Sequence, residues 1–289
     1  MSWSIQRQRL RAVLDGERCV TLATVYDPIT ARLADQLGYE AALMGGSVAS
    51  YAALGAPDLI LITLSELAEQ VHRCARVSTV PLIVDGDHGY GNALNVMRTV
   101  QEMDSAGAAA VAIEDTVQPQ PFGTSAEPML IPFDEAVGKV KAAVAARGDS
   151  DVLVLGRSGA AAIAGIDEAV ARFQAFEAAG VDAIFVPMAQ ERGVIEAVSA
   201  AVKLPLLTPG LPVALCDPAY LSGLRVKAWA AGHHTFAVGL QAMHDAMKAV
   251  KDGTISSCLP GQASKELLDR SLGAANYERW IREFMGGAP

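Results

Sequence analysis

The sequence predicts a (β/α)8 barrel of the TIM type, an α/β fold, followed by a C-terminal helical extension. Short apolar runs alternate with longer segments of helical periodicity, and eight such alternations fit into the chain. The apolar runs are continuous, which is typical of parallel strands buried on both faces. No linker or low-complexity segment interrupts the series. A doubly wound open sheet is the alternative fold with the same pattern.

The expected strands are short and spread along most of the chain. We predict them at residues 19–25, 41–44, 81–84, 109–113, 152–155, 183–186, 204–207 and 226–231. Helical patterns lie between them, and three of these end in a typical C-cap glycine, at Gly107, Gly148 and Gly180. We expect a barrel domain over residues 1–255. An extension over 256–289 follows the Pro/Gly-containing segment CLPGQAS, and we expect it to pack on the barrel or to be exchanged with another subunit.

Composition excludes several classes of function. The chain of 289 residues is 51% hydrophobic and has 23 basic against 32 acidic residues, a net charge of −9. This balance argues against a nucleic-acid or anionic-membrane partner, because such partners select basic surfaces. Four scattered cysteines without metal-binding spacing predict reduced thiols. With neither a signal-peptide pattern nor a membrane-spanning apolar segment, we expect a cytoplasmic protein.

Ionisable side chains follow several of the predicted strands. In a barrel, the carboxyl ends of all strands meet at the face where active sites lie. We therefore expect one site to contain Asp27, Asp85, Asp87, Glu114, Arg157 and His233. Two further polar residues at strand ends, Asp115 and Ser158, are interpreted as solvated loop starts or helix N-caps.

The acidic residues of this set indicate a cation site. Crowded carboxylates either raise their pKa values or bind a cation, and oxygen ligands without a His/Cys cluster favour Mg²⁺, with Mn²⁺ as the alternative. Because Mg²⁺ retains several waters, we expect Asp85 as the direct ligand. Asp87, Glu114 and Asp27 then act through metal-bound water. The alternative interpretation is a set of solvated loop-start residues.

A glycine-rich stretch, GYGNAL at residues 89–94, poses the question of a phosphate site. It contains the first two glycines of GxGxxG, but Leu94 replaces the third. We therefore interpret Gly89 and Gly91 as residues that permit a tight turn from strand to helix.

Two other elements are suited to an anionic substrate. Arg157 at a strand end could hold a carboxylate with its planar guanidinium, or could form a structural ion pair with Glu114. Gly45, Gly46 and Ser47 precede a helical segment, where backbone N–H groups could bind a carboxylate or phosphonate. The alternative for these three residues is an ordinary turn with a serine N-cap.

Several motifs together resemble a known family. They are VYDPITARLA at 25–34, GGSVAS at 45–50, DGDHGYGN at 85–92, IEDT at 113–116, VGKVKAA at 137–143, and Arg157. The ordered set resembles the phosphoenolpyruvate mutase/isocitrate lyase superfamily of metal-dependent barrels. Within that superfamily, it is most similar to the bacterial oxaloacetate decarboxylase branch, which shares GYGNALNVMRTV and a Gly-His pair on the last strand.

The resemblance implies roles for particular residues. It implies that Asp85 binds Mg²⁺, that Ser47 and Arg157 hold the substrate carboxylate, and that His233 contacts the substrate. It also implies a homotetramer built from dimers. The segment after Glu114, VQPQPFGTSAEPM, has no Cys, Lys or His, which disfavours the carbon–carbon lyases of the family. Ser158-Gly159 and Pro209 depart from the pattern of the decarboxylase branch and put substrate choice and activity in question.

The preferred hypothesis is an Mg²⁺-dependent carboxy-lyase that decarboxylates oxaloacetate, or a close 2-oxo diacid, to pyruvate and CO₂ through a metal-stabilised enolate. Arg157 would stabilise the enolate oxygen, and His233 or water would supply the proton. One alternative is a carbon–carbon lyase or phosphonate-processing enzyme of the same superfamily. Another is a barrel that binds a small dicarboxylate without turning it over.

Overall fold

Parallel strands form a ring in the first of two units of the chain, Met1–His233. The computed structural model describes residues 3–124 and 127–286. The second unit, His234–Pro289, is helical. The boundary expected after residue 255 falls within this second unit, immediately before a short 3-10 helix, η2 (Ser256–Cys258).

The strand segments follow one another around the ring in chain order. They are β1 (Val20–Thr21), β2 (Ala23–Thr24), β3 (Ala42–Met44), β4 (Leu82–Asp85), β5 (Ala110–Glu114), β6 (Leu153–Arg157), β7 (Ala183–Phe185), β8 (Leu206–Pro209) and β9 (Val226–Ala230). β1 and β2 are the two halves of the strand predicted at 19–25. Leu22 N donates to Trp229 O at 2.8 Å, and Ala23 N donates to Ala41 O at 3.1 Å. This strand therefore bonds to both β9 and β3, which confirms the barrel and makes the open-sheet alternative wrong.

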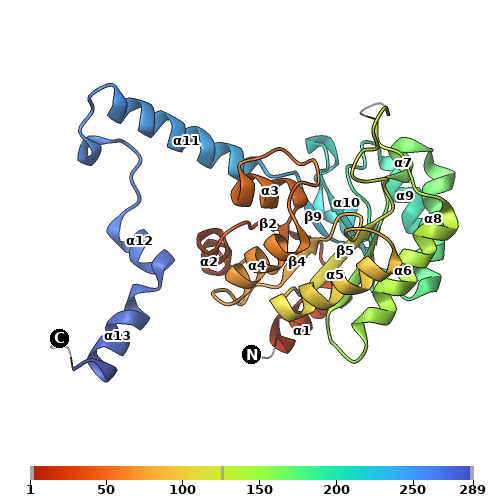
Figure 1. Cartoon of the computed structure of the whole chain (residues 1–289), viewed down its shortest axis with the longest axis horizontal. Helices are drawn as coiled ribbons and strands as arrows, with labels where there is room; N and C mark the ends of the chain where they lie inside the picture. Colours follow the sequence, from red (N-terminus) through yellow and green to blue (C-terminus); the bar gives the residue numbers. More distant parts are fainter. Residues whose placement is uncertain (1–2, 125–126, 287–289) are drawn as a thin grey trace. The chain divides into compact units, whose positions relative to one another are not determined.

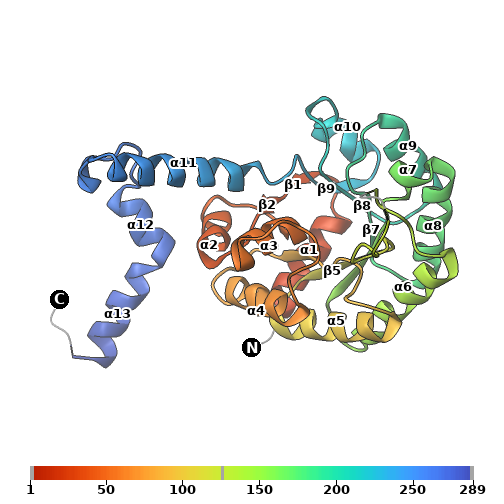
Figure 2. The same ribbon diagram turned by 45° about the horizontal axis from the view of Figure 1, so that its top comes forward.

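Helices surround the strands of the first unit (Figures 1 and 2). They are α1 (Ser4–Asp15), α2 (Pro28–Gln36), α3 (Gly46–Leu54), α4 (Leu64–Ala75), α5 (Ala93–Ala106), α6 (Phe133–Arg147), α7 (Ala160–Ile163), α8 (Ile166–Ala179), α9 (Arg192–Ala201), η1 (Val213–Leu215) and α10 (Pro218–Gly223). The predicted C-cap glycines Gly107, Gly148 and Gly180 directly follow α5, α6 and α8.

The core has two layers because successive strand residues point to opposite faces. In β5, Ala110 and Ala112 face an inner cluster, whereas Val111 and Ile113 face the helices. The inner cluster combines small residues such as these alanines with larger ones such as Ile83 and Phe185. Leu10 and Leu14 of α1 belong to the inner cluster, so α1 packs against the barrel interior.

Contacts of α1 identify the end of the barrel that it covers. Arg7 donates to Ala108 O at 3.2 Å, and Arg9 donates to Thr79 O at 3.1 Å. Ala108 precedes β5 and Thr79 precedes β4. α1 therefore lies at the amino ends of the strands and leaves the carboxyl ends for the polar residues predicted there.

The second unit contains α11 (His234–Lys251), η2, α12 (Lys265–Leu272) and α13 (Ala274–Phe284). None of the residues of α11 is buried. Large apolar side chains in this unit are exposed, including Val238, Met243, Met247, Trp280 and Phe284. Across the described residues, no helix combines the length and apolar character needed to cross a membrane.

Truncation of the inner core at α1 tests this packing. Leu10 is fully buried, so Leu10→Ala leaves a cavity, and we expect the free energy of unfolding to fall by about 2–5 kcal/mol. Ile5→Ala on the same helix is the control, because Ile5 is 62% exposed and surface changes shift stability by about 0.5 kcal/mol. Equilibrium urea denaturation measures both. Equal effects of the two variants would contradict the assignment of Leu10 to the core.

Candidate active site

A cavity of about 370 Å³ lies at the carboxyl ends of the strands. Asp87 and Arg157, both predicted from the sequence, line it together with Asp58 from the loop before α4. The other wall is the segment after β5, including Gln118 and Met129. This cavity therefore combines residues from strand ends with a covering loop.

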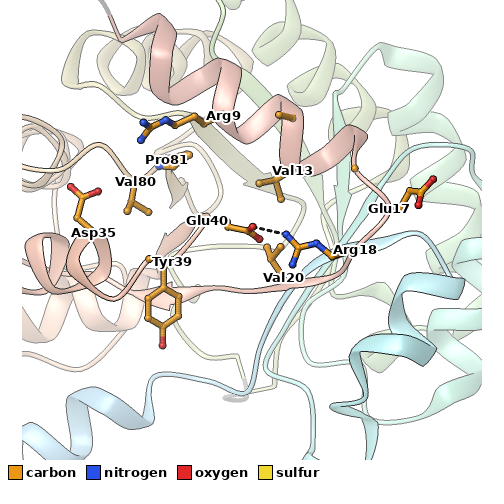
Figure 3. A pocket seen from close by; sticks show the side chains of 13 residues that line it. Arg9, Val13, Glu17, Arg18, Val20, Asp35, Tyr39, Glu40, Val80 and Pro81 are labelled. Carbon is orange, nitrogen blue, oxygen red and sulfur yellow. Dashed lines mark hydrogen bonds and ion pairs between the residues drawn. The ribbon is translucent and has the colours of Figure 1, made fainter.

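A larger cavity, of about 470 Å³, lies at the amino end of the barrel (Figure 3). Residues of α1 and residues that precede strands line it, among them Arg9, Tyr39, Val80 and Pro81. Two of its charged residues form an ion pair, since Arg18 lies 2.6 Å from Glu40. Catalytic residues of such barrels lie at the opposite end, where the predicted residues gather.

Arg157 at the end of β6 is the central cation of the carboxyl-end cavity. Its Nη1 lies 2.5 Å from Asp85 Oδ1 and its Nη2 lies 3.1 Å from Glu114 Oε2. Glu114 and Arg157 are register partners on β5 and β6. The guanidinium also lies 5.7 Å from the ring centre of Phe185. The predicted ion pair with Glu114 is confirmed, and the same guanidinium also contacts Asp85.

The acidic groups around Arg157 outnumber it. Burial alone would lower the pKa of Arg157, but the surrounding carboxylates, with Asp85 and Glu114 first among them, together raise it. Burial and then the Asp85 charge raise the pKa of Asp87 well above its usual range. Burial also raises the pKa of Glu114, although Arg157 opposes this shift. Asp85, Asp87 and Glu114 thus form a site with more carboxyl groups than cations, in which burial and mutual repulsion disfavour the charged form of Asp87.

Asp58 belongs to this charge cluster, although sequence reasoning missed it. Partial desolvation and then the Asp85 charge raise its pKa, and Arg157 opposes the shift. Asp58 follows no predicted strand, because it lies in the loop between α3 and α4. Only the folded chain brings this loop over the cavity.

The glycines before α3 allow close packing around the site. A Cβ at Gly46 would lie 2.8 Å from Asp87 Oδ1, and a Cβ at Gly45 would lie 2.4 Å from His233 Nε2. The Gly46 N–H faces Asp85 Oδ2 at 3.5 Å. The positive pole at the N-terminus of α3 therefore lies beside two carboxylates, and Ser47 is half-buried in its first turn.

His233 is held in the site by a second contact. Its Nδ1 lies 3.2 Å from the Thr24 hydroxyl at the end of β2, so its Nε2 edge is the one that packs against Gly45. Of the two consecutive histidines, the structure brings His233 to the predicted site residues, while His234 begins α11. Thr24 is a site residue that the sequence analysis did not identify.

Asp27 forms a local capping interaction. Its carboxylate caps α2, accepting from Thr30 N at 2.7 Å and from Thr30 Oγ1 at 2.9 Å. Pro28 at the first helical position favours this start. Since both contacts use Asp27 Oδ1 in a local capping box, we leave Asp27 out of the ligand set proposed below.

The stretch DGDHGYG forms a strained turn between β4 and α5. Asp87 and Tyr90 have positive φ angles of 46° and 59°, and Gly89 and Gly91 have φ angles of 76° and 145°. A Cβ at Gly89 would lie 2.3 Å from Val96 Cγ2. The glycines serve the turn, as predicted, and the turn places Asp87 over the N-terminus of α3.

Asp115 and Ser158 are not solvated, so their interpretation as solvated loop starts is wrong. Each is only 1% exposed, and the Ser158 hydroxyl donates to Asp115 Oδ2 at 2.8 Å. Arg172 of α8 lies 3.0 Å from the same oxygen. A cation supplied by a distant helix makes their burial possible, and the local sequence carries no signal for it. Ser158 Oγ does accept from Ala160 N at 3.2 Å, at the start of α7.

Gln118, from the segment after β5, is another residue that sequence reasoning missed. Its Nε2 donates to Glu114 Oε1 at 2.6 Å. Its own Oε1 is buried without a hydrogen-bond partner. Gln118 thus connects the covering loop to the acidic cluster and presents an acceptor there.

The acidic cluster alone does not enclose a cation. Within residues 3–124 and 127–286, no group of three or more His, Cys, Asp or Glu side chains is arranged to hold a metal ion. The chemistry nevertheless fits Mg²⁺, which takes one or two carboxylates and retains water. Asp85 Oδ2 keeps accepting capacity, since its one hydrogen bond, from Gly46 N, is 3.5 Å long. Four carboxylates face one guanidinium, so a divalent cation would offset the excess negative charge.

Comparison with known proteins establishes the family. The sequence profile of the phosphoenolpyruvate phosphomutase family matches residues 10–251. The chain is a phosphoenolpyruvate phosphomutase family member. An oxaloacetate decarboxylase of Paraburkholderia xenovorans (strain LB400) is 67% identical over 282 residues, which cover 98% of this chain and 94% of that protein. The predicted resemblance to the superfamily and to its decarboxylase branch is confirmed, and the protein is an enzyme of this superfamily.

Other family members extend the comparison. An oxaloacetate decarboxylase of Rhodopseudomonas palustris (strain BisB18) is 49% identical over 286 residues, covering 99% of both chains. A phosphonopyruvate hydrolase structure in complex with oxalate and Mg²⁺ has a TM-score of 0.85 and 30% identity, covering 99% of this chain and 100% of the other. The family thus includes members with different reactions on the same barrel.

Filling the space beside His233 tests the site geometry. In Gly45→Ala, the new methyl group meets His233 Nε2, so the imidazole must move and its contact with Thr24 is lost. We expect a shifted His233 signal in ¹H–¹⁵N imidazole spectra, assigned with a His233→Gln variant. Gly159→Ala is the control, because its Cβ meets nothing nearer than Ile163 Cδ1 at 3.6 Å. An unmoved His233 signal in Gly45→Ala would refute this packing.

Proposed function

We propose that the protein is an Mg²⁺-dependent decarboxylase that converts oxaloacetate into pyruvate and CO₂. The observation that carries this proposal is the half-buried Arg157 guanidinium, which lies between Asp85 and Glu114 at the wall of a cavity that Asp58 and Asp87 also line. The name of the relative at 67% identity over nearly the whole chain supports the choice of substrate.

The acidic cluster has the oxygen ligands that Mg²⁺ requires. We assign direct contact to Asp85 through Oδ2, and contact through water to Asp87, Glu114 and Asp58. When bound, Mg²⁺ supplies a Lewis acid that polarises the 2-keto group of the substrate. Mn²⁺ accepts the same oxygen ligands and is the alternative cation.

Residues at the carboxyl face would bind and orient the dianionic substrate. One substrate carboxylate would bind at the start of α3. The Ser47 hydroxyl and the backbone N–H groups that follow Gly45 and Gly46 would donate to it. Arg157 carries a fixed charge for the 2-oxo acid end.

Decarboxylation then needs no nucleophile from the protein. The C3–C4 bond breaks, CO₂ leaves, and the electron pair moves to the keto oxygen to form an enolate. Arg157 would stabilise the developing oxyanion, an interaction worth about 3 kcal/mol for one well-placed donor. One proton then adds to C3 from water or from His233, whose imidazole is oriented by Thr24, and pyruvate results.

The covering loop bears on the alternative reactions. Its described residues have no Cys, Lys or His next to the acidic cluster, and Gln118 occupies the position beside Glu114. A carbon–carbon lyase needs a proton donor for its leaving carbanion, so this loop favours decarboxylation. A panel of 2-methylisocitrate, 2,3-dimethylmalate and phosphonopyruvate separates these reactions. Oxalate binding without turnover of any substrate would indicate a binding protein instead.

Removal of the proposed direct ligand tests the function. With oxaloacetate and Mg²⁺, we expect pyruvate formation to fall roughly a hundredfold in Asp85→Ala and after treatment with EDTA. Calorimetry should show that Asp85→Ala also loses Mg²⁺ binding. Asp167→Asn, an exposed acid on α8, is the control and should behave like the natural protein. A rate that equals Mg²⁺ alone, and that Asp85→Ala leaves unchanged, would rule out the proposal.

We also propose that the chain forms a homotetramer, a dimer of dimers, through its second unit. The α11 helix buries none of its residues, and Met247 is 74% exposed. Exposed apolar area of this kind is normally covered in an assembly.

Light scattering after size exclusion tests this assembly. We expect a mass four times that of the 30.2 kDa chain. Met247→Glu should lower the mass, because a charge would be buried between subunits. Gln241→Glu on the same helix is the charge-matched control and should keep the natural mass, because Gln241 is polar and bonds to Asp245 within α11. A single-chain mass for the natural protein would contradict the tetramer.

A further inference from the structure

A buried arginine on α8 lies directly behind the active site, although it does not reach the cavity. Arg172 is 4% exposed. Its Nη1 lies 3.0 Å from Asp115 Oδ2, its Nη2 donates to Ile131 O at 3.1 Å, and its Nε donates to Glu168 Oε1 at 2.8 Å. All three nitrogens of the guanidinium are thus engaged.

Two of these contacts join the ends of the covering loop. Asp115 begins the loop after β5, and Ile131 ends it before α6. The backbone also joins the two ends, since Ile131 N donates to Asp115 O at 2.9 Å and Val117 N donates to Met129 O at 2.7 Å. Arg172 therefore clamps the base of the loop that carries Gln118.

The other links run to the site residues themselves. Glu114 and Arg157 face each other in register. Asp115 directly follows Glu114, and Ser158 directly follows Arg157. Successive residues of extended segments point to opposite sides, so the acid and the guanidinium face the cavity while Asp115 and Ser158 face α8. The Ser158 hydroxyl donates to Asp115 Oδ2 at 2.8 Å.

We propose that Arg172 is a positioning residue that, through Asp115 and Ser158, holds Glu114 and Arg157 in register and fixes the base of the covering loop. The effect on catalysis rests on the decarboxylase function proposed above. Small displacements of reacting groups cost roughly a hundredfold in rate, so a clamp one peptide unit away from two site residues affects turnover. A lysine at position 172 cannot reproduce the planar guanidinium, which bonds to the Asp115 carboxylate and the Ile131 carbonyl at the same time.

The chain contains a matched control for this clamp. Arg7 is 6% exposed and donates to Ala108 O at 3.2 Å, to Asp104 O at 2.9 Å and to Ser150 Oγ at 3.1 Å. It also lies 2.6 Å from Asp104 Oδ1. Arg7 thus has the same kinds of partner as Arg172, but it lies at the amino end of the barrel.

The test compares Arg172→Met with Arg7→Met in the full-length protein. Both should lower the unfolding temperature, because each removes buried hydrogen bonds. At a temperature where both are folded, we expect only Arg172→Met to lower kcat, by roughly ten- to a hundredfold. Only this variant should also speed thermolysin cleavage between residues 117 and 131. Arg172→Lys should recover part of the lost kcat but less than the natural level.

The outcomes that overturn the proposal are distinct from failure to fold. Natural kcat and natural loop cleavage in folded Arg172→Met would overturn it, as would an equal loss of kcat in Arg7→Met. If Arg172→Met does not fold, Ser158→Ala removes one bond of the network and should lower kcat several-fold; an unchanged kcat would then overturn the clamp. If the natural protein does not decarboxylate oxaloacetate, the loop-cleavage comparison alone decides.

Discussion

The contact on which the site depends is the bridge from Arg157 to Asp85 and Glu114. Three neighbouring strands of the barrel supply these residues, since β4 ends in Asp85, β5 in Glu114 and β6 in Arg157. A buried guanidinium requires anionic partners, and buried carboxylates require a cation. The parallel register therefore brings together groups that none of the three strands could bury alone.

The remaining negative charge gives the site its chemical character. Arg157 offsets part of the charge of its neighbours, while burial and Asp85 keep the pKa of Asp87 well above its usual range. Because Gly45 and Gly46 have no Cβ, the start of α3 can lie close to Asp87. This crowding of carboxyl groups suits a hard divalent cation.

The two faces of β5 and β6 carry residues with different roles. Residues that face the cavity, Glu114 and Arg157, contact one another at the site. Their successors, Asp115 and Ser158, connect to Arg172 behind it. Helix α8 is thus connected to the site residues Glu114 and Arg157 through the residue that follows each of them. Arg172 of the same helix also contacts Ile131 at the end of the covering loop.

Periodicity and local chemistry in the sequence determined the barrel, the strand ends and the site residues Asp85, Asp87, Glu114 and Arg157. Continuous apolar runs and the residues that end them are local signals. The glycine turn was predictable for the same reason. Tertiary structure alone decided the roles of Asp58, Thr24 and Arg172, whose partners are distant in the chain, and of Gln118, because the path of the loop after β5 turns it back onto Glu114. The fold also buries Asp115 and Ser158, because their partner Arg172 lies on another helix. Asp27 caps α2 through its own local sequence. Burial and ion pairing depend on which segments meet, and that depends on the whole fold.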